Sequence, residues 1–280
     1  MTTEIASAPQ VAASRRVDAR GIDTFYLEAG SGEPVVLLHG SGPGVSGDAN
    51  WRLTIPGLSS RYRVLAPDVV GYGATARPPE VRYSLATWTD HVVAFLDALD
   101  LERVALVGNS LGGRLSLELA HRHPERVSRM VLMGSPGVGM TVTEGLQAVR
   151  SYEPSVENMR RLLTDWFAVD PTIITDDLVQ KRYEASLESW DAYRAMFFDP
   201  RHAGNDLAVS EEQVRATRTP TLLVHGREDK VVPADVSWNM VRLLPDADLH
   251  VFARCGHWTQ IERPDEFNAL VADFLAPGRG

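Results

Sequence analysis

A serine between two glycines, placed after an apolar run and before a helical segment, limits the possible folds of this chain most. Residues 104–107 (VALV) have the pattern of a buried strand, residues 108–112 (GNSLG) follow, and helical periodicity runs through 111–123. In a strand-to-helix turn of the type G-x-S-x-G, the glycines accommodate a strained backbone, and the serine hydroxyl rises above the carboxyl edge of the sheet. An incidental serine in a glycine-rich turn would need neither the strand nor the helix. The pattern therefore predicts that Ser110 is a nucleophile.

Strands and helices alternate on both sides of this turn. Short apolar runs typical of buried strands lie at 34–39, 63–67, 127–133, 220–225 and 249–253. Helical periodicity marks 85–99, 111–123, 234–244 and 264–275. This alternation predicts an α/β fold with a mostly parallel central sheet flanked by helices.

The pattern changes between residues 135 and 205, where helical segments at 158–169 and 175–187 follow one another without a convincing strand. We interpret this stretch as an inserted helical cap. The expected division is an N-terminal extension at 1–18, a core formed by 19–134 and 206–280, and the cap at 135–205.

A serine hydroxyl is a weak nucleophile at neutral pH and needs a histidine base, which an acid holds in one tautomer. Asp229 follows one predicted strand, and His257 follows the next. Because the carboxyl ends of parallel strands meet at one edge of a sheet, both are expected beside Ser110. Glu228 is a competing acid, but it should point elsewhere because it is adjacent to Asp229. The predicted triad is Ser110, Asp229 and His257.

The loop at 39–44 (HGSGPG) follows another predicted strand. Backbone N–H groups in such a loop, and directly after a nucleophile, can stabilise charge on a substrate oxygen by about 3 kcal/mol per donor. We expect the amides of Ser41 and Leu111 to form this oxyanion hole. The loop lacks both G-x-G-x-x-G and a lysine-containing phosphate loop, which argues against nucleotide binding.

Charge and composition exclude several classes of function. The 280 residues include 28 basic and 37 acidic ones without a basic run, so no nucleic-acid or anionic-membrane partner is expected. No apolar stretch of about 18 residues occurs, and the first residues do not resemble a secretory signal. The single cysteine, Cys255, fits a reducing compartment, so a cytoplasmic protein is predicted. No metal or organic cofactor is expected, because no H-E-x-x-H type spacing is present.

Three segments resemble those of a known family. They are residues 39–44 (HGSGPG) followed by Asn50 and Trp51, residues 108–110 (GNS), and residues 255–258 (CGHW). These are similar to the meta-cleavage product hydrolases, which have the α/β-hydrolase fold, and the likeness covers nearly the whole chain beyond the extension. Residues 133–138, 143–146 and 225–231 are most similar to the monocyclic branch, which includes 2-hydroxymuconic semialdehyde hydrolase.

The resemblance implies roles for further residues. Arg182, in the predicted cap, falls on the position that binds the substrate carboxylate, and Asn50 and Asn109 fall on its polar partners. An enclosed carboxylate without a partner would cost several kcal/mol, so a guanidinium suits this task. Without the resemblance, Arg182 would be interpreted as a surface charge on an amphipathic helix.

Three more positions are expected to contact substrate by resemblance, namely Gly42, Phe167 and Trp258. The two aromatic residues could equally be ordinary packing residues. The family often has glycine at the position of Ser41, so only the backbone role of that residue is inferred.

The resemblance implies hydrolysis of the C5–C6 bond of 2-hydroxy-6-oxo-dienoates, giving 2-hydroxypenta-2,4-dienoate and a carboxylic acid. Hydrogen or small alkyl at C6 is expected to be preferred over phenyl. Bulky residues expected along that wall are Trp166, Phe167, Met196, Phe197 and Phe198. The expected partner is a small-molecule dienoate, and a homo-oligomer, preferably a dimer, is also expected.

Two alternatives stay open. A carboxylesterase or lactonase could use the same triad, because the geometry of the motif does not identify the scissile bond. A ligand receptor could retain the pocket and use binding to shift a cap surface. The intact triad argues against the receptor.

Overall fold

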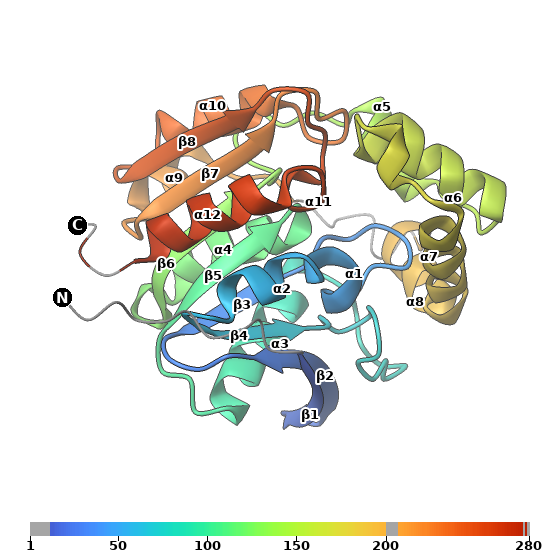
Figure 1. The fold of residues 1–280 in the computed structure, drawn as a ribbon. Coiled ribbons are helices and arrows are strands. Elements are labelled where there is room, and N and C mark those ends of the chain that lie inside the picture. The colour runs from blue at the N-terminus through green and yellow to red at the C-terminus, as the bar shows by residue number, and fades with distance from the viewer. Residues whose placement is uncertain (1–11, 200–206, 277, 279–280) are drawn as a thin grey trace.

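The computed structural model describes residues 12–199, 207–276 and 278. Its centre is an eight-stranded sheet in the order β1-β2-β4-β3-β5-β6-β7-β8 (Figure 1). The strands are β1 (Ala13–Ala19), β2 (Ile22–Ala29), β3 (Pro34–Leu38), β4 (Arg63–Pro67), β5 (Val104–Asn109), β6 (Val127–Met133), β7 (Thr221–Gly226) and β8 (Ala247–Phe252). β1 pairs antiparallel with β2 and β2 with β4, whereas all other pairs are parallel. The predicted α/β class is confirmed.

The first two strands were not predicted from the sequence. β1 pairs with β2 from Ala13 opposite Glu28 to Ala19 opposite Ile22, so residues 13–18 of the expected N-terminal extension form an edge strand of the sheet. β1 is an edge strand whose side chains are mostly exposed, and its sequence therefore carries no apolar alternation. Residues 1–11 lie outside the described part. The other expected boundaries of core and cap stay predictions.

Successive residues of the central strands enter two apolar layers on opposite faces of the sheet. In β5, Val104 and Leu106 belong to one layer, and Ala105 and Val107 belong to the other. The first layer includes side chains of α3 (Leu85–Ala98), α4 (Leu111–Arg122) and α10 (Ala234–Val241). The second includes side chains of α1 (Gly47–Trp51), α2 (Thr54–Leu58) and α12 (Pro264–Leu275). Because both faces of the central strands are buried in this way, their sequences are continuous apolar runs.

The remaining core helices are short. They are η1 (Pro124–Arg126), α9 (Glu211–Ala216) and α11 (Thr259–Glu262), the last of which follows β8 after a loop. That loop carries His257, and the His257 N–H bonds to Phe167, which belongs to the helical region between β6 and α9.

Those helices form the cap, grouped at one side of the molecule (Figure 1). They are α5 (Glu144–Arg150), α6 (Val156–Leu162), the π-helical turn η2 (Leu163–Phe167), η3 (Pro171–Ile173), α7 (Asp176–Glu188) and α8 (Trp190–Phe197). Hydroxyl groups of Thr143, Ser155 and Thr175 accept the N–H three residues ahead, which fixes the starts of α5, α6 and α7. No strand occurs among the described residues from 135 to 199.

A third apolar cluster joins the cap to the core. It combines cap residues such as Val149 and Phe167 with Val231, Trp258 and Ile261 of the core. Because Val231 and Trp258 adjoin Asp229 and His257 in the chain, the position of the cap bears directly on the site.

Candidate active site

Ser110 occupies the sharp turn between β5 and α4, with φ 53° and ψ −114°. A non-glycine residue in this region costs about 1–3 kcal/mol and persists where the surroundings enforce it. A Cβ on Gly108 would lie 2.2 Å from the carbonyl oxygen of Gly112, and one on Gly112 would lie 2.0 Å from that of Leu38. Both glycines are therefore required by close backbone approach, as the motif indicated. The Ser110 N–H donates to Met133 O at 2.9 Å.

Asp229 and His257 are directly paired. Oδ2 of Asp229 lies 2.7 Å from Nδ1 of His257, and both side chains are buried. Burial would raise the pKa of Asp229, but the charges and hydrogen bonds of His257 and His225 hold it well below its usual range. Asp229 is thus an ionised acceptor that fixes the Nδ1–H tautomer of the imidazole and leaves Nε2 for proton transfer.

Glu228, the competing acid, faces another direction. Its Oε2 accepts the N–H of Cys255 at 3.0 Å, and Oε1 pairs with Arg227. These bonds tie it to the base of the His257 loop, and none of its side-chain hydrogen bonds or ion pairs within the described residues is to the imidazole. The geometry favours Asp229 as the acid partner.

The glycine-rich loop after β3 is held by His39. The N–H of Val69 donates to its Nε2 at 2.9 Å, so Nδ1 carries the proton and donates to Gly40 O at 2.7 Å. Burial lowers the pKa of His39, in agreement with this neutral tautomer. The backbone of Gly40 and Ser41 is thereby placed against the elbow, where a Cβ on Gly40 would lie 3.3 Å from Cβ of Ser110.

One cavity brings most of the predicted residues together. Its lining includes the predicted residues Ser41, Gly42, Asn50, Asn109, Ser110, Phe167, Arg182, His257 and Trp258. Asp229 lies behind His257, and the Leu111 side chain points into the core while its amide opens α4 beside Ser110. The free volume is about 20 Å³, enough for about one water molecule.

Arg182 is a buried cation in this cavity. Only 5% of its surface is exposed, its guanidinium carbon lies 5.6 Å from the Trp258 ring centroid, and it takes part in no ion pair within the described part of the chain. Burial chiefly, with Arg52 second, lowers its pKa to about 10, so it stays charged at neutral pH. Its Nε is a buried donor without a partner among the described residues. An uncompensated buried guanidinium calls for an anion.

Asn50 adds a second unsatisfied donor. Its side chain is buried, and Nδ2 has no hydrogen-bond partner within the described residues, while its backbone carbonyl accepts from Gln260 at 3.1 Å. Asn109 instead donates to Met133 O at 3.3 Å. Arg182 and Asn50 both line the cavity, and their unsatisfied donors are suited to a carboxylate.

The apolar part of the cavity lining differs from the expectation. Leu146 and Val149 of α5, with Val231, line the cavity next to Phe167. The expectation of a wall formed by Trp166, Met196, Phe197 and Phe198 is wrong, because none of them lines it. Sequence reasoning missed Leu146 and Val149: their spacing of three residues indicates a shared helix face but does not indicate which cavity that face lines.

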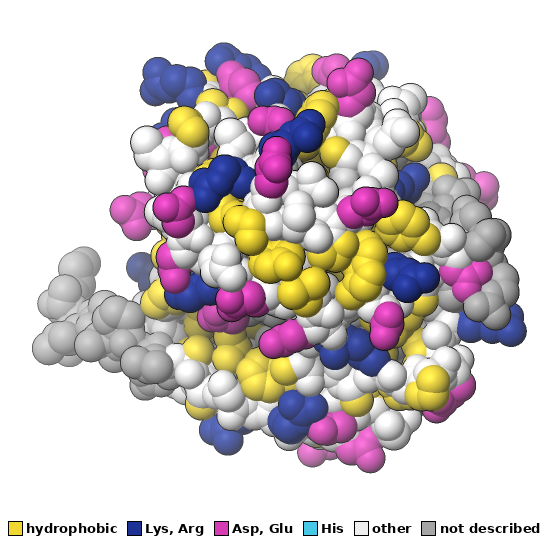
Figure 2. All heavy atoms as spheres, turned by 90° about the vertical axis from the view of Figure 1, so that its right-hand side faces the viewer, with side chains coloured by type: hydrophobic (Ala, Val, Ile, Leu, Met, Phe, Trp, Pro, Cys, Tyr) yellow, Lys and Arg dark blue, Asp and Glu magenta, His cyan; other side chains and the backbone are white. Residues whose placement is uncertain are grey.

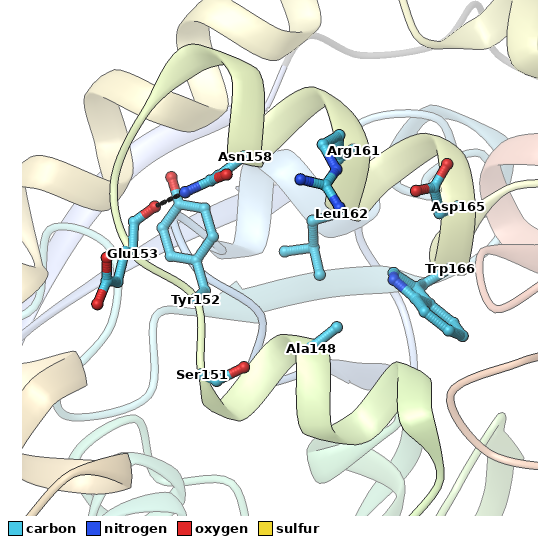
Figure 3. A pocket seen from close by; sticks show the side chains of 9 residues that line it. All are labelled: Ala148, Ser151, Tyr152, Glu153, Asn158, Arg161, Leu162, Asp165 and Trp166. Atoms are coloured by element: carbon cyan, nitrogen blue, oxygen red, sulfur yellow. Dashed lines mark hydrogen bonds between the residues drawn. The ribbon is translucent and has the colours of Figure 1, made fainter.

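A second cavity lies on the other side of α5 (Figure 3). Ala148 of α5 and Ser151, the residue after that helix, face Arg161, Leu162 and Trp166 across it, and its free volume is about 240 Å³. Helix α5 therefore separates this outer, open cavity from the enclosed one that contains Ser110. Trp166, expected in the substrate cavity, lines the outer one.

The cap side carries both signs of charge. Figure 2 shows Lys and Arg side chains interspersed with Asp and Glu around a group of apolar side chains near the middle of this face. No described helix is long and apolar enough to cross a membrane.

Comparison with known proteins identifies the family. A sequence model of the α/β-hydrolase fold matches residues 33–264. The chain is 50% identical over 265 residues to a 2-hydroxy-6-oxo-2,4-heptadienoate hydrolase of Pseudomonas putida (strain F1). The match covers 94% of this chain and 96% of that protein. The chain belongs to the meta-cleavage product hydrolases of the α/β-hydrolase superfamily.

Other members of this family agree in sequence and shape. A 2-hydroxymuconate semialdehyde hydrolase of Pseudomonas sp. (strain CF600) is 48% identical, with 96% of this chain and 95% of that protein covered. A meta-cleavage product hydrolase of Pseudomonas fluorescens IP01, solved with bound acetates, is 51% identical with a TM-score of 0.89, and 93% of this chain and 96% of that chain are covered. This meta-cleavage product hydrolase is a serine-type enzyme, as its sequence predicted.

Proposed function

We propose that the protein hydrolyses the C5–C6 bond of 2-hydroxy-6-oxo-dienoates formed by ring fission of monocyclic catechols. Its 50% and 48% identical relatives are named as hydrolases of such compounds. The observation that carries the proposal is Arg182, a buried guanidinium without an acidic partner among the described residues, in the same cavity as Ser110. A neutral ester would leave this charge uncompensated, whereas a dienoate supplies the missing carboxylate.

In the proposed complex, the substrate carboxylate accepts from Arg182 and from Nδ2 of Asn50. The diene then extends towards Ser110, with the C6 substituent against Leu146, Val149 and Val231. Fixing the carboxylate orients C5 and C6 relative to the imidazole and hydroxyl, which lowers the entropic part of the barrier.

Catalysis begins with a proton shift. The 2-hydroxyl loses its proton as C5 gains one, with His257 as the carrier, and the conjugated dienol becomes a ketone. The 2-oxo group can then accept the electron pair of the bond that breaks. Asp229 stabilises the imidazolium formed during this transfer.

A nucleophile next adds to the C6 carbonyl, either Ser110 Oγ or a water molecule activated in its place. The amides of Ser41 and Leu111 bind the oxyanion, which is where preorganised donors contribute most. Collapse of the tetrahedral adduct breaks C5–C6, and the electron pair returns to the enol of 2-hydroxypenta-2,4-dienoate. With one water consumed, the other product is a carboxylic acid, and no metal or organic cofactor takes part.

The test uses the yellow ring-fission products of catechol, 3-methylcatechol and 2,3-dihydroxybiphenyl. We expect purified enzyme to remove the visible absorbance of the first two and to release the corresponding acid. Efficient hydrolysis of p-nitrophenyl esters without turnover of any dienoate would support a carboxylesterase instead. Binding of a dienoate without turnover would support a receptor. A homodimer, testable by light scattering, and a cytoplasmic location stay predictions.

A further inference from the structure

The loop that carries His257 is bonded to the cap as well as to the core. The His257 N–H donates to the carbonyl oxygen of Phe167, the last residue of η2, at 2.8 Å. The Phe167 ring also stands edge-on to the imidazole, with centroids 5.4 Å apart and an interplanar angle of 82°. The base of the triad thus has a hydrogen bond and a ring contact from one cap residue.

Glu262, at the end of α11, bridges the same two segments. Its Oε1 accepts the N–H groups of Val169 and Asp170 in the cap, at 2.8 and 3.1 Å. Its Oε2 accepts the N–H of Gly256, next to His257, at 2.6 Å. Each carboxylate oxygen therefore serves one segment, and hydrogen bonds to an ionised acceptor are among the stronger ones in proteins.

The close approach of the two segments also requires a glycine. A Cβ on Gly256 would lie 2.6 Å from Phe167 O and 3.2 Å from Oε2 of Glu262. Any side chain there would push the loop away from residues 167–170. The contact is consequently built from three parts: the glycine, the carboxylate, and the Phe167 carbonyl.

We propose that Glu262 is a positioning residue: it links the position of residues 167–170 in the cap to the position of His257. This inference rests on the proposed role of His257 as the base. The free volume of about 20 Å³ is enough for about one water molecule, so a dienoate can bind only if lining groups move, and Phe167 is one of the lining groups. Glu262 restores the bond between Phe167 O and His257 N–H after that movement, because it holds the adjoining amides on both sides.

The decisive variant is Glu262→Gln. The glutamine side chain keeps one oxygen, but its NH2 group would face backbone N–H donors. Either residues 169–170 or Gly256 therefore lose their acceptor. The matched control is Glu228→Gln, because Glu228 accepts the N–H of Cys255 in the same loop and none of its hydrogen bonds within the described residues reaches the cap. Both variants remove one negative charge, and both weaken a hydrogen bond to the loop that carries His257.

Two readouts are measured for each protein. Hydrogen–deuterium exchange should become faster in Glu262→Gln both at residues 167–170 and at the His257 amide, although that amide does not bond to Glu262. Turnover of 2-hydroxymuconic semialdehyde should fall about tenfold to a hundredfold in kcat, with KM within about threefold, because misplacement of a catalytic group by about 1 Å has this effect. Glu228→Gln should change kcat by less than about threefold.

Gly256→Ala supplies an independent test, since it separates the segments while the carboxylate stays. It should give the same kcat loss and the same faster exchange at 167–170. Unchanged His257 exchange in Glu262→Gln, or equal kcat losses in Glu262→Gln and Glu228→Gln, would overturn the coupling. If the wild-type protein does not cleave dienoates, the proposed function fails, but the exchange measurements still decide whether Glu262 couples the two segments.

Discussion

Asp229 uses its two carboxylate oxygens for different purposes. Oδ2 lies 2.7 Å from Nδ1 of His257, while Oδ1 accepts the N–H groups of Val231 and Val232 at 2.8 and 2.9 Å. The backbone bonds prevent rotation of the carboxylate and direct its other oxygen at the imidazole. Glu228, one residue earlier, makes its backbone bond to Cys255 instead.

Substitutions in the triad should therefore be severe. Ser110→Ala and His257→Ala are each expected to lower kcat for the dienoate by at least about a thousandfold, because triad members act as a unit. Asp229→Asn should also cause a large loss, since an amide can favour the wrong imidazole tautomer. Steady-state kinetics on 2-hydroxymuconic semialdehyde measure this, with Glu228→Gln as the control. Near-full activity in Asp229→Asn together with a large loss in Glu228→Gln would contradict the assignment.

The turn at Ser110 and the pairing of Asp229 with His257 could be predicted from sequence because they depend on local pattern. A strand, a glycine-flanked serine and a helix specify the turn at Ser110, and Asp229 follows its own strand in the same way. Leu146 and Val149 could not be assigned with the same reasoning. Their role depends on how the cap packs over the core, and nothing local distinguishes them from Met196, which is buried against Gly71 elsewhere.

Arg182→Ala should raise KM for the dienoate by about tenfold or more and also lower kcat. The guanidinium is buried without an acidic partner in the described structure, so the substrate carboxylate is its expected counterion. The control is Lys181→Ala, which removes an exposed positive charge from the same helix and should have little effect. Hydrolysis of a neutral p-nitrophenyl ester should suffer less than dienoate cleavage. Equal losses on both substrates would indicate that Arg182 serves cap folding instead.

Acid should remove the stabilisation that Asp229 contributes. Although burial opposes it, pairing with His257 and His225 holds the pKa of Asp229 below its usual value in the folded protein. A depressed folded pKa contributes stability above the unfolded value of about 3.9, and the contribution is lost as the pH falls through the folded pKa. The free energy of unfolding in urea should therefore differ more between wild type and Asp229→Asn at pH 5 than at pH 3. If the difference in unfolding free energy between the two proteins were larger at pH 3 than at pH 5, the expected direction would be wrong.

The part of the site least accessible to sequence reasoning is the apolar wall, where packing between layers decides which side chains meet. Phe167 lines the cavity that contains Ser110, whereas its neighbour Trp166 lines the outer cavity (Figure 3). Both residues belong to the π-helical turn Leu163–Phe167, and no residue pattern in that segment predicts such a turn.

Hydrogen or methyl at C6 should be preferred over phenyl. The C6 substituent is proposed to lie against Leu146, Val149 and Val231, in a cavity whose free volume is about 20 Å³. A phenyl group must displace more of this wall than a methyl group, and overpacking typically costs about 1–3 kcal/mol, or roughly tenfold to a hundredfold in specificity. We would compare kcat/KM for 2-hydroxymuconic semialdehyde, its 6-methyl ketone and its 6-phenyl ketone. Leu146→Ala should reduce the difference in kcat/KM between the methyl and phenyl ketones, because it opens space beside the C6 substituent. A wild-type preference for phenyl would refute the monocyclic assignment and leave the carbon–carbon hydrolysis unaffected.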